Sequence, residues 1–210
     1  MDREKALTIV KTLKKTYPDA KAALHFSNSF ELLIATILSA QCTDKRVNEV
    51  TGRLFEEYKK PVDYLGISQQ QLEQEIRSCG FYHNKAKNIL ATCRMLEDEF
   101  SGMVPKSRED LMRLPGVGRK TANVVLSNAF GVPAIGVDTH VFRVSRRLGL
   151  SDGKNPEQVE RDLMDVLPEE LWSLSHHLLI FHGRNICHSR RPQCEICPVK
   201  QLCNYYLTNS

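Results

Sequence analysis

Apolar residues recur every three or four positions along most of this chain, which is the spacing of an amphipathic helix. The first such segment, residues 3–15, places Ala6, Val10 and Leu13 on one face, and Pro18 ends it. The same spacing predicts helices over residues 44–58, 68–79, 85–100, 107–114, 118–130, 138–148, 155–166 and 169–183. The only strand candidate is the short segment 132–137. The pattern therefore predicts an all-α protein.

Residues 30–40 differ from the other segments because they are apolar nearly all round. Such a pattern indicates a helix buried at the centre of a domain. Asn28, followed three residues later by Glu31, is typical of the cap that opens a helix. Asp44 is expected to cap the helix that comes next.

Composition places the chain among ordinary globular proteins. It has 210 residues, of which 41% are hydrophobic and 26% charged, enough for one large domain or two small ones. No apolar run of about 18 residues predicts a membrane span. Residues 1–5 lack the apolar segment of a secretory signal, so a cytoplasmic protein is expected. The net charge of +4 permits a polyanionic partner but does not establish one.

Residues 114–122, Leu-Pro-Gly-Val-Gly-Arg-Lys-Thr-Ala, join two of the predicted helices. Pro115 ends the first helix, and Gly116 and Gly118 permit positive φ angles and a close approach of another backbone. The second helix then begins with unpaired N–H groups and the positive end of its dipole, which suit a phosphate. For a Gly-x-Gly considered alone, a simple corner between helices is the alternative.

Lys120 lies in the first turn of that second helix. The helix dipole and Arg119 both disfavour a positive charge there, which favours the neutral amine that a Schiff-base nucleophile needs. A lysine that only binds phosphate is the simpler alternative. Asp138, in Val-Asp-Thr-His at residues 137–140, is predicted to cap the following helix.

Four of the seven cysteines lie close together near the C-terminus, in the pattern C-x6-C-x2-C-x5-C. They are Cys187, Cys194, Cys197 and Cys203. Without a secretory signal, this spacing indicates a metal site more than disulfides. Spacing alone leaves zinc as an alternative to an iron–sulfur cubane. The other cysteines, Cys42, Cys79 and Cys93, are expected to be small core residues.

The hairpin and the Val-Asp-Thr-His stretch resemble the endonuclease III family of DNA glycosylases, and the resemblance covers almost the whole chain. It implies a helix-hairpin-helix motif that contacts backbone phosphate. It also implies that Lys120 attacks the sugar C1′, that Asp138 assists, and that the four clustered cysteines hold a [4Fe–4S] cluster. The DNA-binding residues it implies in the hairpin are Gly116, Val117, Gly118, Arg119 and Thr121.

The resemblance assigns three further residues to the DNA interface. Gln41, in Leu-Ser-Ala-Gln, is implied to fill the gap left by an extruded base. Phe81 takes the place of a leucine that wedges into the duplex in relatives, and we expect an aromatic to keep that role with an altered fit. The alternative for Phe81 is an aromatic residue buried in a satellite core. His140, two residues after Asp138, is placed near the same site.

Together these features predict two helical lobes. Residues 22–132 form a six-helix lobe with the hairpin, and residues 1–21 and 133–210 form the lobe with the cluster. The implied function is removal of oxidised pyrimidines from double-stranded DNA, followed by β-elimination at the abasic site through a lysine Schiff base. The expected partner is duplex DNA carrying a damaged pyrimidine or an abasic site. The protein is expected to be a monomer associated with the nucleoid.

Rival functions share parts of this sequence pattern. An adenine-mismatch glycosylase of the same superfamily has the hairpin, the aspartate and the cluster but lacks the lysine. Lys120 therefore argues against it, and against a thymine- or uracil-mismatch relative. A non-catalytic DNA-binding module would use the hairpin and cluster as scaffold, and Lys120 together with Asp138 argues against that.

Overall fold

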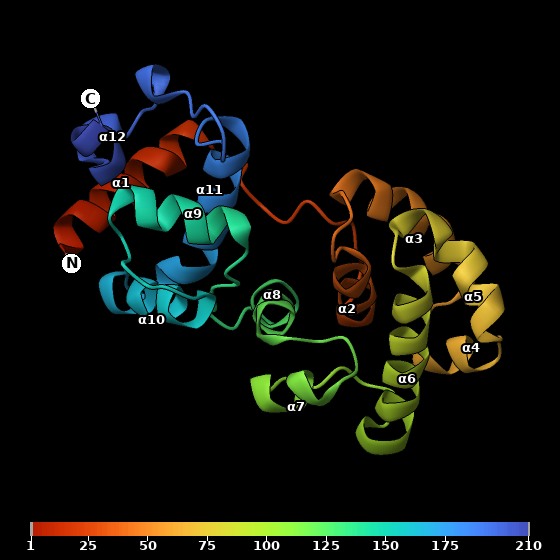
Figure 1. The fold of residues 1–210 in the computed structure, drawn as a ribbon. Helices are drawn as coiled ribbons and strands as arrows, with labels where there is room; N and C mark the ends of the chain where they lie inside the picture. The colour runs from red at the N-terminus through yellow and green to blue at the C-terminus, as the bar shows by residue number, and fades with distance from the viewer. Residues whose placement is uncertain (1, 210) are drawn as a thin grey trace. The chain divides into compact units, whose positions relative to one another are not determined.

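The structure, a computed structural model that describes residues 2–209, consists of helices joined by connections of varied length, the longest of them between α1 and α2 and between α11 and α12 (Figure 1). No strand occurs among these residues, so the prediction of an all-α protein is confirmed. The α-helices are α1 (Arg3–Thr16), α2 (Ser29–Leu38), α3 (Asp44–Glu57), α4 (Pro61–Leu65), α5 (Gln69–Ile76), α6 (Tyr82–Phe100), α7 (Arg108–Arg113), α8 (Arg119–Phe130), α9 (Thr139–Leu148), α10 (Pro156–Val166), α11 (Trp172–Asn185) and α12 (Asn204–Asn209). Four 3-10 turns join them: η1 (Arg77–Cys79), η2 (Glu169–Leu171), η3 (Cys194–Ile196) and η4 (Lys200–Leu202).

The chain folds into two compact units. Residues Ala22–Val132 form one, and the other combines the residues up to Lys21 with those from Pro133 onward. The first unit contains α2 to α8, including the five-residue helix α4, which is too short to leave a periodic apolar pattern.

Helix α2 is the core of the unit formed by residues 22–132. Nearly all of its side chains are buried, and it packs against α3, α6 and α8. The predicted cap is present, because Asn28 Oδ1 accepts a hydrogen bond from the Glu31 N–H at 2.9 Å. Glu31 Oε2 in turn accepts from the Ser27 N–H at 2.6 Å. The helix ends at Leu38, two residues earlier than the apolar pattern predicts.

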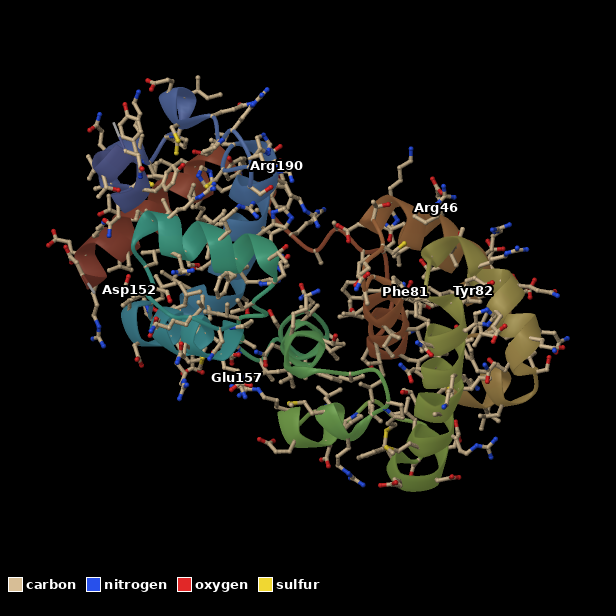
Figure 2. The ribbon with its side chains drawn as sticks, viewed as in Figure 1. Arg46, Phe81, Tyr82, Asp152, Glu157 and Arg190 are labelled. Atoms are coloured by element: carbon tan, nitrogen blue, oxygen red, sulfur yellow. The ribbon has the colours of Figure 1, made fainter. Side chains whose placement is uncertain are left out.

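Two helix starts differ from the prediction. Thr43 caps α3, with its Oγ1 3.3 Å from the Arg46 nitrogen, and Asp44 is the first helical residue. A carboxylate is also favourable at that position because it faces the positive end of the helix dipole. Helix α6 begins at Tyr82, three residues before the expected start, directly after Phe81 (Figure 2).

Residues 132–137 do not form the strand that their composition suggested. The segment has no regular secondary structure and buries Ala134, Ile135 and Val137. A strand needs a neighbouring strand to complete its hydrogen bonds, and the part of the chain that the structure describes offers none. The apolar side chains are buried by helix packing instead.

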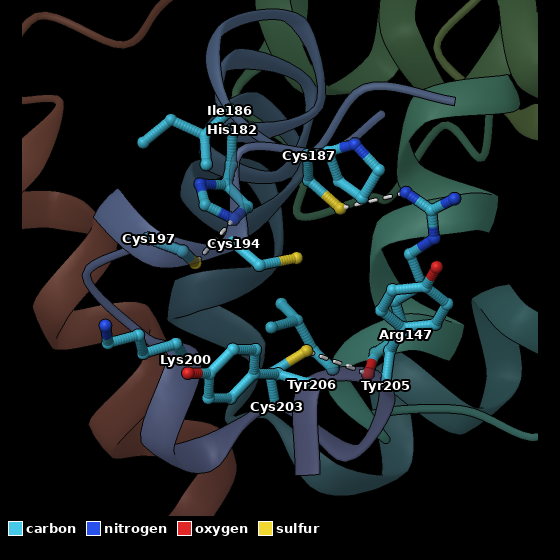
Figure 3. A pocket seen from close by; sticks show the side chains of 12 residues that line it. Arg147, His182, Ile186, Cys187, Cys194, Cys197, Lys200, Cys203, Tyr205 and Tyr206 are labelled. Atoms are coloured by element: carbon cyan, nitrogen blue, oxygen red, sulfur yellow. Dashed lines mark hydrogen bonds between the residues drawn. The ribbon is translucent and has the colours of Figure 1, made fainter. Parts of the chain in front are cut away.

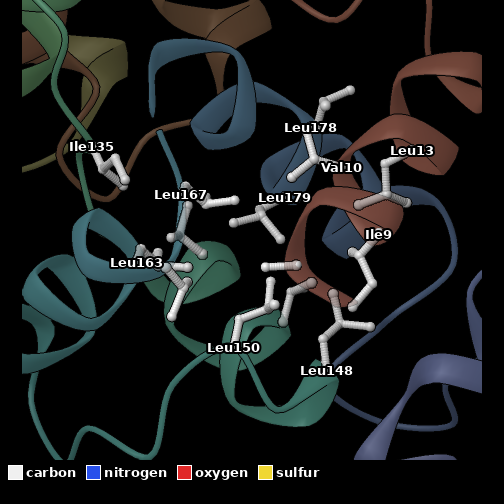
Figure 4. Close-up of a cluster of buried hydrophobic side chains, with 14 of the residues drawn as sticks. Ile9, Val10, Leu13, Ile135, Leu148, Leu150, Leu163, Leu167, Leu178 and Leu179 are labelled. Carbon is white, nitrogen blue, oxygen red and sulfur yellow. The ribbon is translucent and has the colours of Figure 1, made fainter. Parts of the chain in front are cut away.

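The other unit is built around an apolar core shared by α1, α9, α10 and α11 (Figure 4). Ile9 and Leu13 of α1 are fully buried there together with Leu148, Leu163 and Leu178. Burial of this apolar surface binds the N-terminal helix to the C-terminal part of the chain. Between residues 2 and 209, no helix combines the length and the apolar character needed to cross a membrane.

Candidate active site and cysteine cavity

The glycine hairpin connects α7 to α8 with a tight turn. Its backbone is closed by the Val117 N–H, which donates to the Leu114 carbonyl at 3.0 Å, and the Val117 side chain is buried. Gly116 has a φ of +79°, where a side chain would be strained. A Cβ on Gly116 would also lie 2.9 Å from the Asn88 Nδ2 atom. Gly116 is therefore required by both its backbone conformation and its neighbour.

Gly118 differs from Gly116 in its backbone conformation and its surroundings. Its φ is −93°, which any residue adopts, and a Cβ there would meet no atom within 4 Å. The positive φ that glycine permits is therefore used at Gly116 and not at Gly118. Its missing side chain instead leaves open space at the exposed start of α8.

Two contacts from neighbouring helices support the hairpin. The Thr92 hydroxyl of α6 donates to the Pro115 carbonyl at 2.9 Å. Arg108 Nε of α7 donates to Oδ1 of Asn123, a fully buried residue of α8, at 2.9 Å. Sequence reasoning missed Thr92, Asn123 and Asn88 because lone polar residues in helices carry no pattern.

The amino end of α8 presents the lysine singled out from the sequence. Gly118 provides no side-chain cap, and the first turn contains Arg119, Lys120 and Thr121 but no acidic residue. The first helical hydrogen bond runs from the Ala122 N–H to the Gly118 carbonyl. Lys120, the second helical residue, is exposed. The helix start thus combines a favourable place for an anion with an accessible amine.

Asp138 caps α9, as predicted. Its Oδ1 accepts hydrogen bonds from the N–H groups of His140 and Val141, both at 2.8 Å. Its second oxygen, Oδ2, receives no hydrogen bond from any residue that the structure describes. The cap fixes the orientation of a partly buried carboxylate and leaves one oxygen available for chemistry.

His140 lies beside this carboxylate and inside the same unit. Its Nδ1 is 3.1 Å from Arg143 Nη2. Burial lowers the pKa of His140 below its usual value, although the nearby Asp138 charge opposes the shift. Burial thus favours the neutral ring of His140, which packs within its unit. Any contact of His140 with DNA stays a prediction.

Two arginines of α9 fasten this helix to the cysteine-rich segment. Arg143 Nη2 donates to the carbonyls of Gly183 and Cys187, both at 3.0 Å. Arg147 Nη1 donates to the His188 carbonyl at 2.6 Å and lies 3.5 Å from Cys187 Sγ. The helix that Asp138 caps is thus held in place by the segment that begins at Cys187.

The four clustered cysteines line one cavity that is partly open to solvent (Figure 3). Between residues 2 and 209, no three His, Cys, Asp or Glu side chains are grouped to hold a single metal ion. Arg147 and Lys200 line the same cavity, which gives it positive charge. Thiolate donors around a shared space, with cations nearby, fit a cluster that carries net negative charge.

His182 connects this cavity to α1. It is fully buried, its Nε2 lies 3.6 Å from Cys197 Sγ, and its Nδ1 lies 3.2 Å from the Tyr17 hydroxyl. Burial lowers the pKa of His182 to about 4, so the ring is neutral near neutral pH. His182 is thus a core residue, and its place beside Cys197 had no signal in the sequence.

The sequence is similar to known proteins along most of its length. Residues 34–169, which include the hairpin and Asp138, match the model of the HhH-GPD superfamily base excision DNA repair protein. The endonuclease III of Bacillus subtilis is 53% identical over 188 residues, which are 89% of this chain and 86% of that protein. The chain belongs to the endonuclease III family.

Further similarities support this membership in the endonuclease III family. The Escherichia coli endonuclease III is 46% identical over 205 residues, 98% of this chain and 97% of that protein. A trapped endonuclease III–DNA covalent intermediate has the same fold, with a TM-score of 0.95 and 51% identity over 99% of this chain and 98% of that one. The resemblance inferred from the sequence is thus confirmed.

The cofactor expectation is confirmed as well. Residues 187–203 match the iron-sulfur binding domain of endonuclease III, and this match begins at Cys187 and ends at Cys203. As a member of the endonuclease III family, the chain carries a [4Fe–4S] cluster.

Replacing Cys187 by alanine is expected to remove the cluster and destabilise the unit that contains α9. Cluster ligation is coupled to folding, so losing one thiolate removes part of the folding free energy. The native protein should contain iron and sulfide and absorb at about 400 nm, whereas the variant should lose this band and unfold at a lower temperature. Cys93→Ala is the control, because Cys93 is buried in α6 of the other unit. Stoichiometric zinc in anaerobically purified native protein would contradict this expectation.

Proposed function

We propose that this chain removes oxidised pyrimidines from double-stranded DNA and then cleaves the resulting abasic site by β-elimination. The observation that carries the proposal is the exposed Lys120 at the second position of α8, directly behind the glycine hairpin. A DNA phosphate bound at this helix start brings its sugar within reach of the lysine amine. The arrangement therefore joins a sequence-independent DNA anchor to a nucleophile.

The first step is displacement of the damaged base. The Lys120 Nζ lone pair attacks C1′ of the deoxyribose, and the bond from C1′ to the base breaks with its electron pair leaving on the base. Asp138 assists by accepting the proton from the attacking amine or by stabilising positive charge that develops on the sugar. Its fixed Oδ1 and available Oδ2 suit either task.

The second step cuts the strand. The sugar ring opens to give an imine between Lys120 Nζ and C1′. Loss of a proton from C2′ then allows the C3′–O bond to break, and the phosphate leaves on the 3′ side. Hydrolysis of the imine frees the lysine. No step needs an oxidant or a reductant.

Access to C1′ and recognition of the lesion require the damaged nucleotide to leave the base stack. We propose that Gln41 fills the space it leaves and that Phe81 wedges into the duplex. Both side chains are exposed, and the Phe81 side chain reaches 63% exposure. An aromatic residue of a satellite core would be buried. The exposure of Phe81 therefore favours a contact with DNA.

We propose that Cys187, Cys194, Cys197 and Cys203 hold the cluster, because all four line one cavity. When bound, the cluster supplies a rigid covalent cross-link and a redox-capable centre. Arg147, which lies beside Cys187, offsets the negative charge of the cluster. Arg147 is a residue of α9, the helix that Asp138 caps. Binding of the cluster thus stabilises the helix that presents the carboxylate.

We propose that the protein acts as a monomer in the cytoplasm, on the DNA of the nucleoid. The remaining hairpin residues named from the sequence, Val117, Arg119 and Thr121, support backbone binding in this proposal. Val117 does so indirectly because its side chain is buried beneath the turn.

A panel of duplexes tests the proposed function directly. The native protein should release the base and cut the strand at an oxidised pyrimidine, and should cut at an abasic site. Undamaged duplex and duplex with an adenine mismatch should stay intact. Release of adenine from the mismatch, with no strand cleavage at the abasic site, would favour the mismatch glycosylase instead.

Changing Gly118 to alanine is expected to weaken binding to every duplex by the same factor, on the order of tenfold, because the new methyl group occupies the space used by a phosphate. Its thermal unfolding should change little, since a Cβ at Gly118 meets no protein atom within 4 Å. Titrations at several salt concentrations should show affinity falling steeply with salt for the native protein.

Gly116→Ala provides the contrasting variant. It should lower the unfolding temperature because of the φ of +79° and the contact with Asn88. A loss of affinity for Gly118→Ala that is confined to one lesion would argue against a phosphate anchor at the hairpin.

A further inference from the structure

Lys85 is a buried lysine that the proposed mechanism does not use. It lies in the first turn of α6 with only 5% of its surface exposed. Its Nζ donates to the Leu38 carbonyl at 2.8 Å and to the Cys79 carbonyl at 2.7 Å. Burial lowers its pKa from the usual value. No carboxylate in the described part of the chain forms an ion pair with it.

This position is costly for a cation. The amino end of α6 repels positive charge, and burial removes the ammonium group from water. The hydrogen bonds to the two carbonyls offset this cost. These carbonyls belong to Leu38 and Cys79, the last residues of α2 and η1. Carbonyls at helix ends lack partners within their helix, and a lysine donor satisfies them. Lys85 thus connects the ends of two elements rather than stabilising its own helix.

Both carbonyls lie two or three residues before a residue that we assign to the DNA interface. Leu38 begins the Gln41 loop, residues 38–41, and Cys79 begins the Phe81 loop, residues 79–81. The backbone N–H of Lys85 also donates to the Phe81 carbonyl at 3.1 Å. The Lys85 side chain therefore joins both loops by two hydrogen bonds, while its backbone N–H makes the first helical hydrogen bond of α6.

The conformations at the loop tips need such support. Gln41 has a φ of 51° and Phe81 a φ of 47°, both in the left-handed region. For residues with side chains, this region costs about 1–2 kcal/mol each. Such conformations persist where surrounding contacts determine them. Both tips are exposed, so the support has to come from beneath, where Lys85 lies.

We propose that Lys85 is a positioning residue whose ammonium group cross-links the Gln41 loop and the Phe81 loop and sets their spacing for insertion into DNA. The inference rests on the proposed function, since it concerns how the same site detects a damaged nucleotide. Lys85 acts only through the two loops and touches neither the sugar nor the base.

The test compares Lys85→Met, which keeps the length but removes the charge and the donors, with Leu96→Ala. Leu96 is fully buried near the other end of α6, so its truncation destabilises the same helix without touching the loops. The measured quantity is the ratio of affinities for a duplex with an abasic-site analogue and for undamaged duplex. Lys85→Met should lower this ratio at least tenfold with unchanged affinity for undamaged duplex, and Leu96→Ala should preserve the ratio.

A spectroscopic signal reports insertion itself. 2-Aminopurine placed opposite the abasic-site analogue should brighten when the native protein inserts its loops, and this increase should be lost in Lys85→Met. If Lys85→Met does not fold, Lys85→Gln, which retains an N–H donor, should show a smaller loss in the same direction. A fluorescence increase in the folded variant equal to the native one would overturn the inference.

A double-mutant cycle with Phe81→Ala separates positioning from general stability. If Lys85 acts through the Phe81 loop, Lys85→Met should cost much less discrimination in the Phe81→Ala background than in the native one. Additive losses would overturn the inference. Native protein that cuts abasic DNA, combined with an unaffected Lys85→Met variant, would refute only the role of Lys85. Native protein that neither excises nor cuts would refute the proposed function and this inference with it.

Discussion

Replacing Lys120 by glutamine is expected to abolish the covalent adduct that borohydride forms between the native protein and abasic DNA. Borohydride reduces an imine to a stable amine, and only a primary amine that attacks C1′ forms that imine. Glutamine has no nucleophilic amine. Strand cleavage at the abasic site should fall to background, because β-elimination depends on the same imine.

DNA binding separates this effect from a loss of structure. Lys120→Gln should bind the duplex within a few-fold of the native affinity, since the backbone N–H groups at the start of α8 remain. Lys87→Gln, at an exposed position on α6, is the charge-matched control and should be trapped normally. A trapped adduct at native yield in Lys120→Gln would mean that another amine is the nucleophile.

Replacing Asp138 by asparagine is expected to slow base removal by about two to three orders of magnitude, the range expected when a positioned acid–base group is lost. Asparagine retains an oxygen that accepts from the N–H groups of His140 and Val141, so α9 should keep its cap. Single-turnover excision of an oxidised pyrimidine measures the rate, and thermal unfolding checks the fold.

The matched control is another cap in the same unit. Asn155 caps α10 through its Oδ1, which accepts from the Gln158 N–H at 2.9 Å. Asn155→Ala should cost about 1 kcal/mol of stability and leave excision unchanged. Excision by Asp138→Asn at the native rate would reduce Asp138 to a structural cap.

Local features of this protein were predictable because their physical causes lie within a few residues. The caps at Asn28 and Asp138 each involve N–H groups two or three positions away, so a short polar pattern is enough to predict them. The buried nature of α2 follows from apolar residues on every face. The family likewise follows from contiguous strings such as Leu-Pro-Gly-Val-Gly-Arg-Lys.

Prediction from the sequence was less accurate where two residues, or two backbone conformations, suited a position about equally well. Thr43 and Asp44 are both good caps, and only the path of the backbone decides which side chain turns toward the Arg46 N–H. Gly116 and Gly118 look alike in the sequence, yet only Gly116 adopts a positive φ. The apolar residues at 132–137 suit a strand, but pairing depends on a neighbour that a local pattern cannot supply.

The sequence by itself therefore determined most of the helices, the caps at Asn28 and Asp138, the hairpin, the spacing of the cysteines and the family, but not the short helices α4 and α12. Only the tertiary structure decided what supports them. Lys85 reaches a carbonyl 47 positions away, and Tyr17 reaches His182 across 165 positions. Such contacts form because packing of apolar faces brings distant helix ends together, and the buried polar groups there must then find hydrogen-bond partners. A buried lysine and a buried histidine leave no periodic signal, so their roles emerge only when the chain is folded.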